Sequence, residues 1–120
     1  AETLEAQRTP VAVLGGHHVS ERALRLTRER IQHHWAERGY TCDLWVDPPG
    51  TVWADFVKDE NQLVLVLDGS LLLEMQGRKV SMGPGDELLI PAGVRHTVRN
   101  LGTGTLRWLC GHQRQQTAAN

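Results

Sequence analysis

The sequence contains little that would mark a secreted or membrane protein. Its two cysteines, Cys42 and Cys110, do not form a C-x-x-C pair and are too few for a disulfide framework. The longest apolar run covers residues 63–67, far short of the roughly 18 residues that cross a bilayer. The N-terminus also lacks a basic patch followed by an apolar core, the pattern of a secretory signal. We therefore expect a cytoplasmic protein in a reducing compartment.

The chain lacks a strong charge of either sign. Lys and Arg number 13, and Asp and Glu number 14, which gives a net charge of -1. We therefore expect neither nucleic acid nor a membrane as a partner. With 120 residues, 40% of them hydrophobic, the chain has the size and composition of one folded domain and not of a disordered segment. The expected partner is a small molecule or another protein.

One segment near the N-terminus has the spacing of an amphipathic helix. Leu24, Ile31 and Trp35 fall on one face of it. Ser20 is placed to cap its first turn and Gly39 to end it. The residues before and after this segment have no comparable helical period, so we expect a single helix.

From residue 40 onward, apolar and polar residues alternate in short runs separated by turn residues. Seven or eight such runs, with turns about every 8 to 12 residues, predict an all-β sandwich or small barrel rather than βαβ units. The polar ends lack any apolar period and are expected to be flexible. We therefore divide the single domain into a flexible N-terminus (1–10), an N-terminal strand (11–14) with the helix (together 11–39), the main body (40–112) and a flexible C-terminus (113–120).

Residues 85–100 combine two turns with a strand that carries a histidine, and read G-D-E-L-L-I-P-A-G-V-R-H-T-V-R-N. Alternation along this strand places His96, Val98 and Asn100 on one face, turned toward a closed interior. The segment resembles the second motif of the cupin superfamily, G-D-x4-P-x-G-x2-H-x3-N, at every fixed position. The resemblance implies a jelly-roll β-barrel with the helix packed outside, and a homodimer as the assembly.

The first cupin motif, G-x5-H-x-H-x3-E-x6-G, aligns with residues 50–69 with both glycines in register. In metal-dependent cupins its two histidines and glutamate, with the histidine of the second motif, hold one divalent metal ion. In this chain Phe56, Lys58 and Gln62 stand at three of these positions, so that only His96 is retained. One imidazole beside an ammonium group is too small a donor set for a transition metal.

No metal or other cofactor is therefore expected. The remaining metal hypothesis adds His112 and Cys110 of the last predicted strand to His96, because these two residues share a face of that strand. A divalent transition metal stays the alternative cofactor in that case.

The altered interior predicts an apolar cup with a few polar groups, which is typical of small-molecule sites. Lys58 and His96 are the candidate catalytic residues, because two titratable groups in one apolar site suit proton transfer. A second placement of Lys58 stays open, in which its side chain extends to the mouth of the interior and forms an ion pair there. Trp45 and Trp53 are expected to face outward, since they alternate with residues assigned to the interior. The expected ligand-binding residues are Phe56, Gln62, Val64, Val98, Asn100 and Trp108.

The residues leave three functions open, and with them the question of whether the chain is an enzyme. The first is the binding of a small organic molecule without metal, with acid–base chemistry by Lys58 and His96 in the enzymatic version. The second is a metal-dependent oxygenase, lyase or isomerase in which His96 and unconventional ligands hold the ion. The third is a non-catalytic structural or regulatory module whose interior is simply packed.

Overall fold

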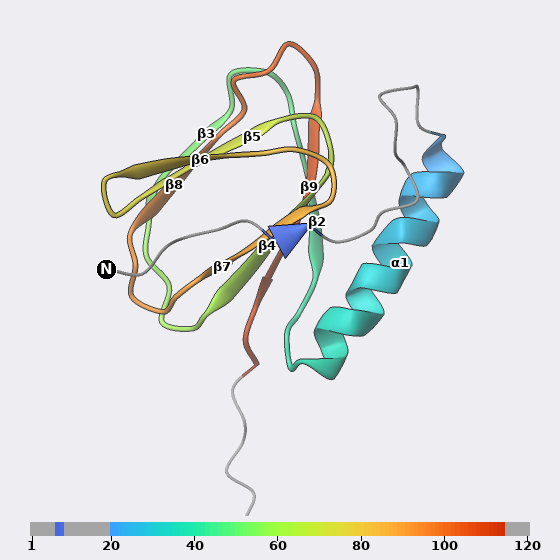
Figure 1. Cartoon of the computed structure of the whole chain (residues 1–120), viewed down its shortest axis with the longest axis horizontal. Helices are drawn as coiled ribbons and strands as arrows, with labels where there is room; N and C mark the ends of the chain where they lie inside the picture. The colour runs from blue at the N-terminus through green and yellow to red at the C-terminus, as the bar shows by residue number, and fades with distance from the viewer. Residues whose placement is uncertain (1–6, 9–19, 115–120) are drawn as a thin grey trace, which may run out of the picture.

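The computed structural model describes residues 7–8 and 20–114, which form one helix and nine strands (Figure 1). The strand expected at 11–14 and most of the two terminal segments lie outside the described residues. The elements are β1 (Gln7–Arg8), α1 (Glu21–Glu37), β2 (Asp43–Asp47), β3 (Val52–Phe56), β4 (Gln62–Asp68), β5 (Leu71–Met75), β6 (Arg78–Met82), β7 (Asp86–Ile90), β8 (His96–Arg99) and β9 (Leu106–His112).

The strands form two antiparallel sheets that pack face to face. One sheet has the order β1-β7-β4-β9-β2 and the other has the order β3-β8-β5-β6. Figure 1 shows α1 lying against the outside of the larger sheet. The predicted all-β jelly-roll with one helix packed outside is therefore confirmed.

Strand β4 explains the longest apolar run of the sequence. Val64 and Val66 point into the core between the two sheets. Leu63, Leu65 and Leu67 point to the other face, where they pack with the helix. Because this central strand is covered on both faces, its residues read as a continuous apolar run and not as an alternation.

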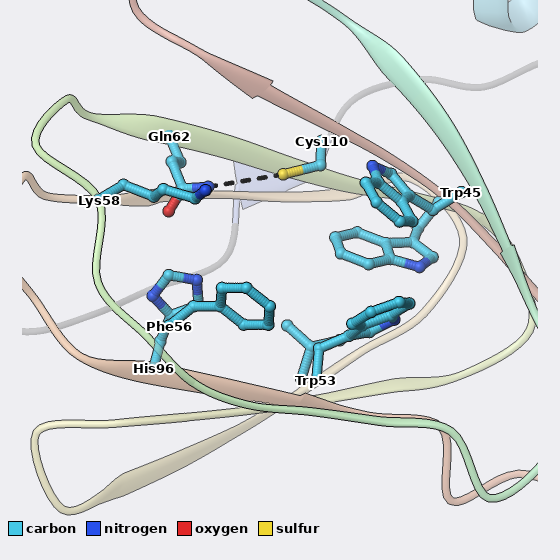
Figure 2. Close-up of a pocket in the computed structure, with 9 residues that line it drawn as sticks. Trp45, Trp53, Phe56, Lys58, Gln62, His96 and Cys110 are labelled. Carbon is cyan, nitrogen blue, oxygen red and sulfur yellow. Dashed lines mark hydrogen bonds between the residues drawn. The ribbon is translucent and has the colours of Figure 1, made fainter.

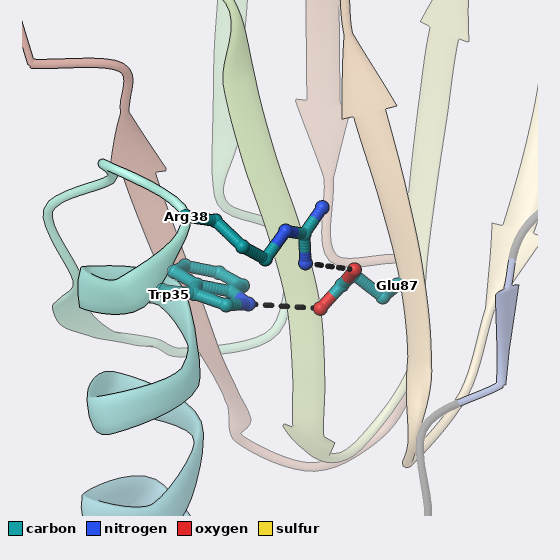
Figure 3. Close-up of polar contacts among 3 residues, drawn as sticks. All are labelled: Trp35, Arg38 and Glu87. Atoms are coloured by element: carbon teal, nitrogen blue, oxygen red, sulfur yellow. Dashed lines mark hydrogen bonds and ion pairs between the residues drawn. The ribbon is translucent and has the colours of Figure 1, made fainter.

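The helix begins and ends where its sequence predicts. The side chain of Ser20 accepts a hydrogen bond from the backbone N–H of Ala23, and Gly39 after the helix has a φ of 85°. Trp35 anchors the C-terminal end, because its indole N–H donates to a carboxylate oxygen of Glu87 over 2.8 Å. Arg38 donates to the second oxygen over 3.1 Å. Both contacts fasten α1 to β7 (Figure 3).

The motif at residues 85–100 brings the loop after β3 next to the start of β8. The backbone N–H of Gly93 donates to the carbonyl of Lys58 over 2.8 Å. Gly93 has a φ of 80°, which favours glycine at this turn. This hydrogen bond fixes the backbone of Lys58 beside the strand that carries His96.

Among the described residues, no helix is both long enough and apolar enough to span a membrane. The single described helix, α1, covers 17 residues and buries only one of its faces, formed by Leu24, Thr27, Ile31 and Trp35.

Candidate functional site

A cavity of about 150 Å³ lies between the two sheets, at the end where β3 and β4 are joined by a loop. It opens to solvent beside Trp45 and Phe56, which are 41% and 38% exposed. Figure 2 shows its walls. We call it the aromatic cavity, and its lining residues are Trp45, Trp53, Phe56, Lys58, Gln62, His96, Val98, Trp108 and Cys110.

Three indole rings form one wall of the aromatic cavity. Trp45 meets Trp53 edge to face with 5.3 Å between ring centroids, and stacks on Trp108 at 6.2 Å. Trp53 and Trp108 each donate their indole N–H to the same carboxylate oxygen of the buried Asp47, both over 2.9 Å. Since Asp47 holds two of the three rings, the wall has its shape before any ligand enters.

The expectation that Trp45 and Trp53 face outward is wrong, since both line the cavity. In β2 the alternation is opposite to the one expected: Leu44 and Val46 are partly exposed beside the helix, and Trp45 faces inward. In β3 a register shift lies between Trp53 and Phe56. This bulge changes the alternation, so that two aromatic residues three positions apart reach the same cavity.

His96 is buried and presents its ring to the cavity from β8. Its Nδ1 atom lies 3.2 Å from the carbonyl oxygen of Val94. A carbonyl only accepts hydrogen bonds, so this contact assigns the proton of the neutral ring to Nδ1 and leaves the lone pair on Nε2. Burial is the main cause that lowers the pKa of His96 below its usual value, and the nearby charge of Lys58 lowers it further. At neutral pH the ring is therefore an uncharged base or hydrogen-bond acceptor.

Lys58 stands at the rim of the cavity and not inside it. The residue is exposed, because it follows the end of β3 where the chain leaves the sheet. Of the two placements open for Lys58, the structure has the one at the mouth, and Lys58 and His96 still line the same cavity. Its ammonium group lies 5.7 Å from the centroid of the Phe56 ring, within the range of a cation–π contact. Among the described residues, no carboxylate forms an ion pair with it.

Gln62 and Cys110 are the two other polar residues that line the aromatic cavity. The amide Nε2 of Gln62 donates to the sulfur of Cys110 over 3.7 Å, and Gln62 is itself buried at the start of β4. Burial raises the pKa of the Cys110 thiol to about 11. The thiol is therefore neutral at physiological pH and is not an activated nucleophile.

The predicted ligand-binding residues are divided by the structure. Phe56, Gln62, Val98 and Trp108 line the aromatic cavity, whereas Val64 and Asn100 do not. Val64 lies two residues further along β4 than Gln62 and is part of the core between the sheets. The side chain of Asn100 forms hydrogen bonds with the backbone instead. Its amide N–H groups donate to the carbonyls of Asp47 and Gly104, and its oxygen accepts from the backbone N–H of Gly102.

The fold does not bring together His96, His112 and Cys110, the three residues of the alternative metal site. Cys110 lines the cavity with His96, but His112 is exposed at the end of β9 and contacts the hydroxyl of Thr41 at 3.2 Å. Within residues 7–8 and 20–114, no three His, Cys, Asp or Glu side chains are grouped as a metal site requires.

Sequence reasoning missed three residues of the site: Trp45, Trp53 and Asp47. Strict alternation predicts the outer face of the sheets for both tryptophans, whereas both line the cavity. A signal for Asp47 exists, since an aspartate two residues after Trp45 in an alternating strand lies on the same face of the sheet. A carboxylate on an interior face requires hydrogen-bond donors, and the indoles are the donors that the chain supplies.

Comparison with solved structures gives the same fold at low sequence identity. A cupin 2 conserved barrel domain protein from Salinispora arenicola is 18% identical with a TM-score of 0.58, over 92% of this chain and 76% of that one. A cupin domain of an XRE family transcriptional regulator from Enterobacter cloacae is 15% identical with a TM-score of 0.60, over 68% and 90%. A sugar phosphate isomerase of the cupin superfamily from Silicibacter pomeroyi is 23% identical with a TM-score of 0.58, over 64% and 52%.

No curated protein matches the chain. The family model described as "Cupin domain" matches residues 43–112, which span every strand from β2 to β9 and all residues of the aromatic cavity. The chain therefore belongs to the cupin family.

Proposed function

We propose that this cupin binds a small organic molecule in the aromatic cavity without the help of a metal ion. The observation that carries the proposal is that two complementary polar groups line one aromatic-walled cavity. One is the His96 ring, with its Nε2 lone pair available, and the other is the Lys58 cation, which forms no ion pair with any described residue. A concave, mostly apolar site with a few convergent polar groups is the usual form of a small-molecule site.

The donor chemistry of the cavity supports a metal-free site. Transition-metal sites in proteins use three or more imidazole, thiolate or carboxylate donors. The positions that correspond to the family's metal ligands hold Phe56, Lys58, Gln62 and His96. Of these, only His96 is such a donor, and the Lys58 cation would repel a metal ion. Cys110 adds a thiol whose raised pKa opposes the deprotonation that metal binding requires.

The same geometry supports proton transfer as the chemistry of the site. His96 accepts a proton at Nε2 from an acidic C–H or O–H of the ligand, and its Nδ1–H keeps the bond to Val94. The negative charge left on the ligand is stabilised by the ammonium group of Lys58. Gln62 lines the same cavity and orients a ligand oxygen through its amide. In this scheme Lys58 transfers no proton and acts only through its positive charge at the rim.

Tryptophan fluorescence tests the proposal, because three of the four tryptophans line the cavity. We expect benzyl alcohol, benzoate or benzylamine to quench the fluorescence saturably. We expect the quenching to be lost or weakened in His96→Leu and preserved in His33→Leu, which changes an exposed histidine of α1. Failure of all three probes to bind the wild-type protein would contradict the proposal.

Metal content is measured on the same protein, purified without a polyhistidine tag or chelator. We expect only traces of transition metal by inductively coupled plasma mass spectrometry. The traces should persist after incubation with iron, zinc or manganese followed by desalting. A content near one equivalent that falls in His96→Leu would establish the metal-dependent alternative instead.

A further inference from the structure

We propose that the ligand of the aromatic cavity is a small aromatic monocarboxylate, with its ring against the tryptophan wall and its carboxylate on Lys58. This inference rests on the proposed function, since it names the class of molecule for the same site. It follows from three properties of the cavity: its charge, its size and the separation of its aromatic and polar parts.

The charge of the cavity favours an anion. Lys58 is the one formally charged residue among the described lining residues, and no Asp or Glu belongs to the lining. Asp47 lies behind the wall, where one of its oxygens accepts both indole N–H groups. A cationic ligand would therefore meet the ammonium group of Lys58 without an acidic side chain to balance it.

The size of the cavity limits the ligand to about one ring. An apolar cavity of about 150 Å³ accommodates a molecule the size of benzene, and the aromatic cavity has this volume. It is open on one side, beside Trp45 and Phe56. A substituent on the ring can therefore extend toward the rim, where Lys58 stands.

The two ends of the cavity differ in chemistry. Figure 2 shows Trp45 and Trp53 at one side, and Lys58, Gln62 and His96 at the other. Aromatic rings pack on one another in offset or edge-to-face geometry, which the tryptophan wall offers to a ring of the ligand. A carboxylate at the opposite side can pair with the Lys58 ammonium group and accept from the Gln62 amide. A molecule that is aromatic at one end and anionic at the other satisfies both sides.

Titration calorimetry with four probes tests this assignment: benzoate, benzyl alcohol, benzylamine and acetate. We expect benzoate to bind about tenfold more tightly than benzyl alcohol, because its contact with Lys58 is charge-assisted. Benzylamine, which lacks the anion, and acetate, which lacks the ring, should bind more weakly than benzoate. The preference for benzoate should decrease as salt is added.

The two lysines of the chain provide a matched pair of variants. Lys58→Met retains the length of the side chain and removes its charge, and should abolish the preference for benzoate, so that this variant binds benzoate no more tightly than benzyl alcohol. Lys58→Arg should retain the preference. Lys79→Met changes an exposed lysine of β6 that does not line the aromatic cavity, and should behave as wild type.

The outcomes separate the failure of this inference from the failure of the proposed function. Binding of benzyl alcohol or benzylamine as tightly as benzoate would overturn the anionic class and leave a small-molecule site in place. Binding of acetate as tightly as benzoate would overturn the aromatic part of the assignment. If no probe binds, the proposed function fails together with the inference.

Discussion

The rings of Trp53 and Phe56 lie on the wall of one cavity with 6.2 Å between their centroids, although the residues are three positions apart on one strand. In a regular strand, residues three apart point to opposite faces. The register of β3 against β8 shifts between these two residues, and Asp55 within the shift has a φ of 57°. The bulge thus gives the cavity a second aromatic ring from the same strand.

Replacing Asp55 tests this bulge. A positive φ strains a β-branched residue but not glycine. We expect Asp55→Val to lower the free energy of unfolding by about 1–2 kcal/mol, and Asp55→Gly to leave it nearly unchanged. Urea denaturation followed by far-UV circular dichroism measures both. Ala54→Val, at the preceding exposed position of β3, is the control and should have little effect. Equal stability of Asp55→Val and Asp55→Gly would show that the bulge carries no strain.

Asp47 should be the residue on which the tryptophan wall depends. Asp47→Ala removes the acceptor of two indole N–H groups, and an unsatisfied buried donor destabilises by about 1–3 kcal/mol. We expect a loss of this size for the buried Trp108 indole, a smaller loss for the half-buried Trp53 indole, and a loss of the near-UV dichroism of the tryptophans. Asp43→Ala removes the same charge from an exposed position of β2 and should keep the wild-type signal. A wild-type near-UV spectrum in Asp47→Ala would refute the positioning role.

Particular residues show how far the cavity could be predicted from the sequence. In β8, a regular strand, alternation correctly placed His96 and Val98 on the interior face. In β3 the same rule failed for Trp53, because a bulge is a non-local feature that depends on pairing with β8. Alternation alone cannot decide between the interior and the mouth for Lys58, because β3 ends two residues earlier, at Phe56.

The fold itself was easier to predict than the cavity. The two turns of the second cupin motif and the capping of α1 by Ser20 are local signals, and the structure contains each of them. The roles of Asp47 and Asn100 depend on contacts between distant segments, such as the bond from Trp108 to Asp47. Spacing along the chain does not show which residues meet in this way.

The lowered pKa of His96 predicts a dependence of stability on pH. In the unfolded chain this imidazole has its ordinary pKa of about 6.5. In the folded protein, burial lowers the pKa of His96 most, the hydrogen bond to Val94 partly opposes this, and the charge of Lys58 adds a smaller lowering. As the pH falls below about 6.5, the unfolded state therefore takes up a proton before the folded state does. We therefore expect the free energy of unfolding to decrease as the pH falls from about 6.5 toward the folded pKa of His96. Below that pKa, His96 causes no further decrease.

Urea denaturation at pH 7.5, 6.5 and 5.5 measures this slope. His96→Gln should reduce the loss of stability on acidification, because the titrating group is gone. Lys58→Met should reduce this loss slightly, since it removes the smaller of the two causes that lower the pKa of His96. Identical slopes in the wild type and His96→Gln would show that the folded protein does not hold this imidazole neutral.

We expect that no residue larger than glycine fits at position 111 without loss of stability, because β9 passes close to the end of the helix there. A Cβ atom at this position would lie 1.8 Å from the carbonyl oxygen of Thr41 and 3.1 Å from the ring of Trp35. Because the first neighbour is backbone, β9 must shift to accommodate the methyl group, and β9 also carries Trp108 and Cys110 into the cavity. We expect Gly111→Ala to lower the free energy of unfolding by about 3 kcal/mol and to weaken binding of the cavity probes.

Gly83→Ala is the matched control for this substitution. A Cβ atom added at Gly83 would meet no atom within 4 Å beyond its own chain neighbours, and the φ of Gly83 lies outside the left-handed region. We therefore expect the stability and probe affinity of this variant to equal those of the wild type within about 0.5 kcal/mol. A Gly111→Ala variant as stable as Gly83→Ala would mean that the end of α1 and Thr41 can move away from β9 without loss. In that case the position of Trp108 would not depend on the helix, and the cavity could be redesigned independently of the outer layer of the fold.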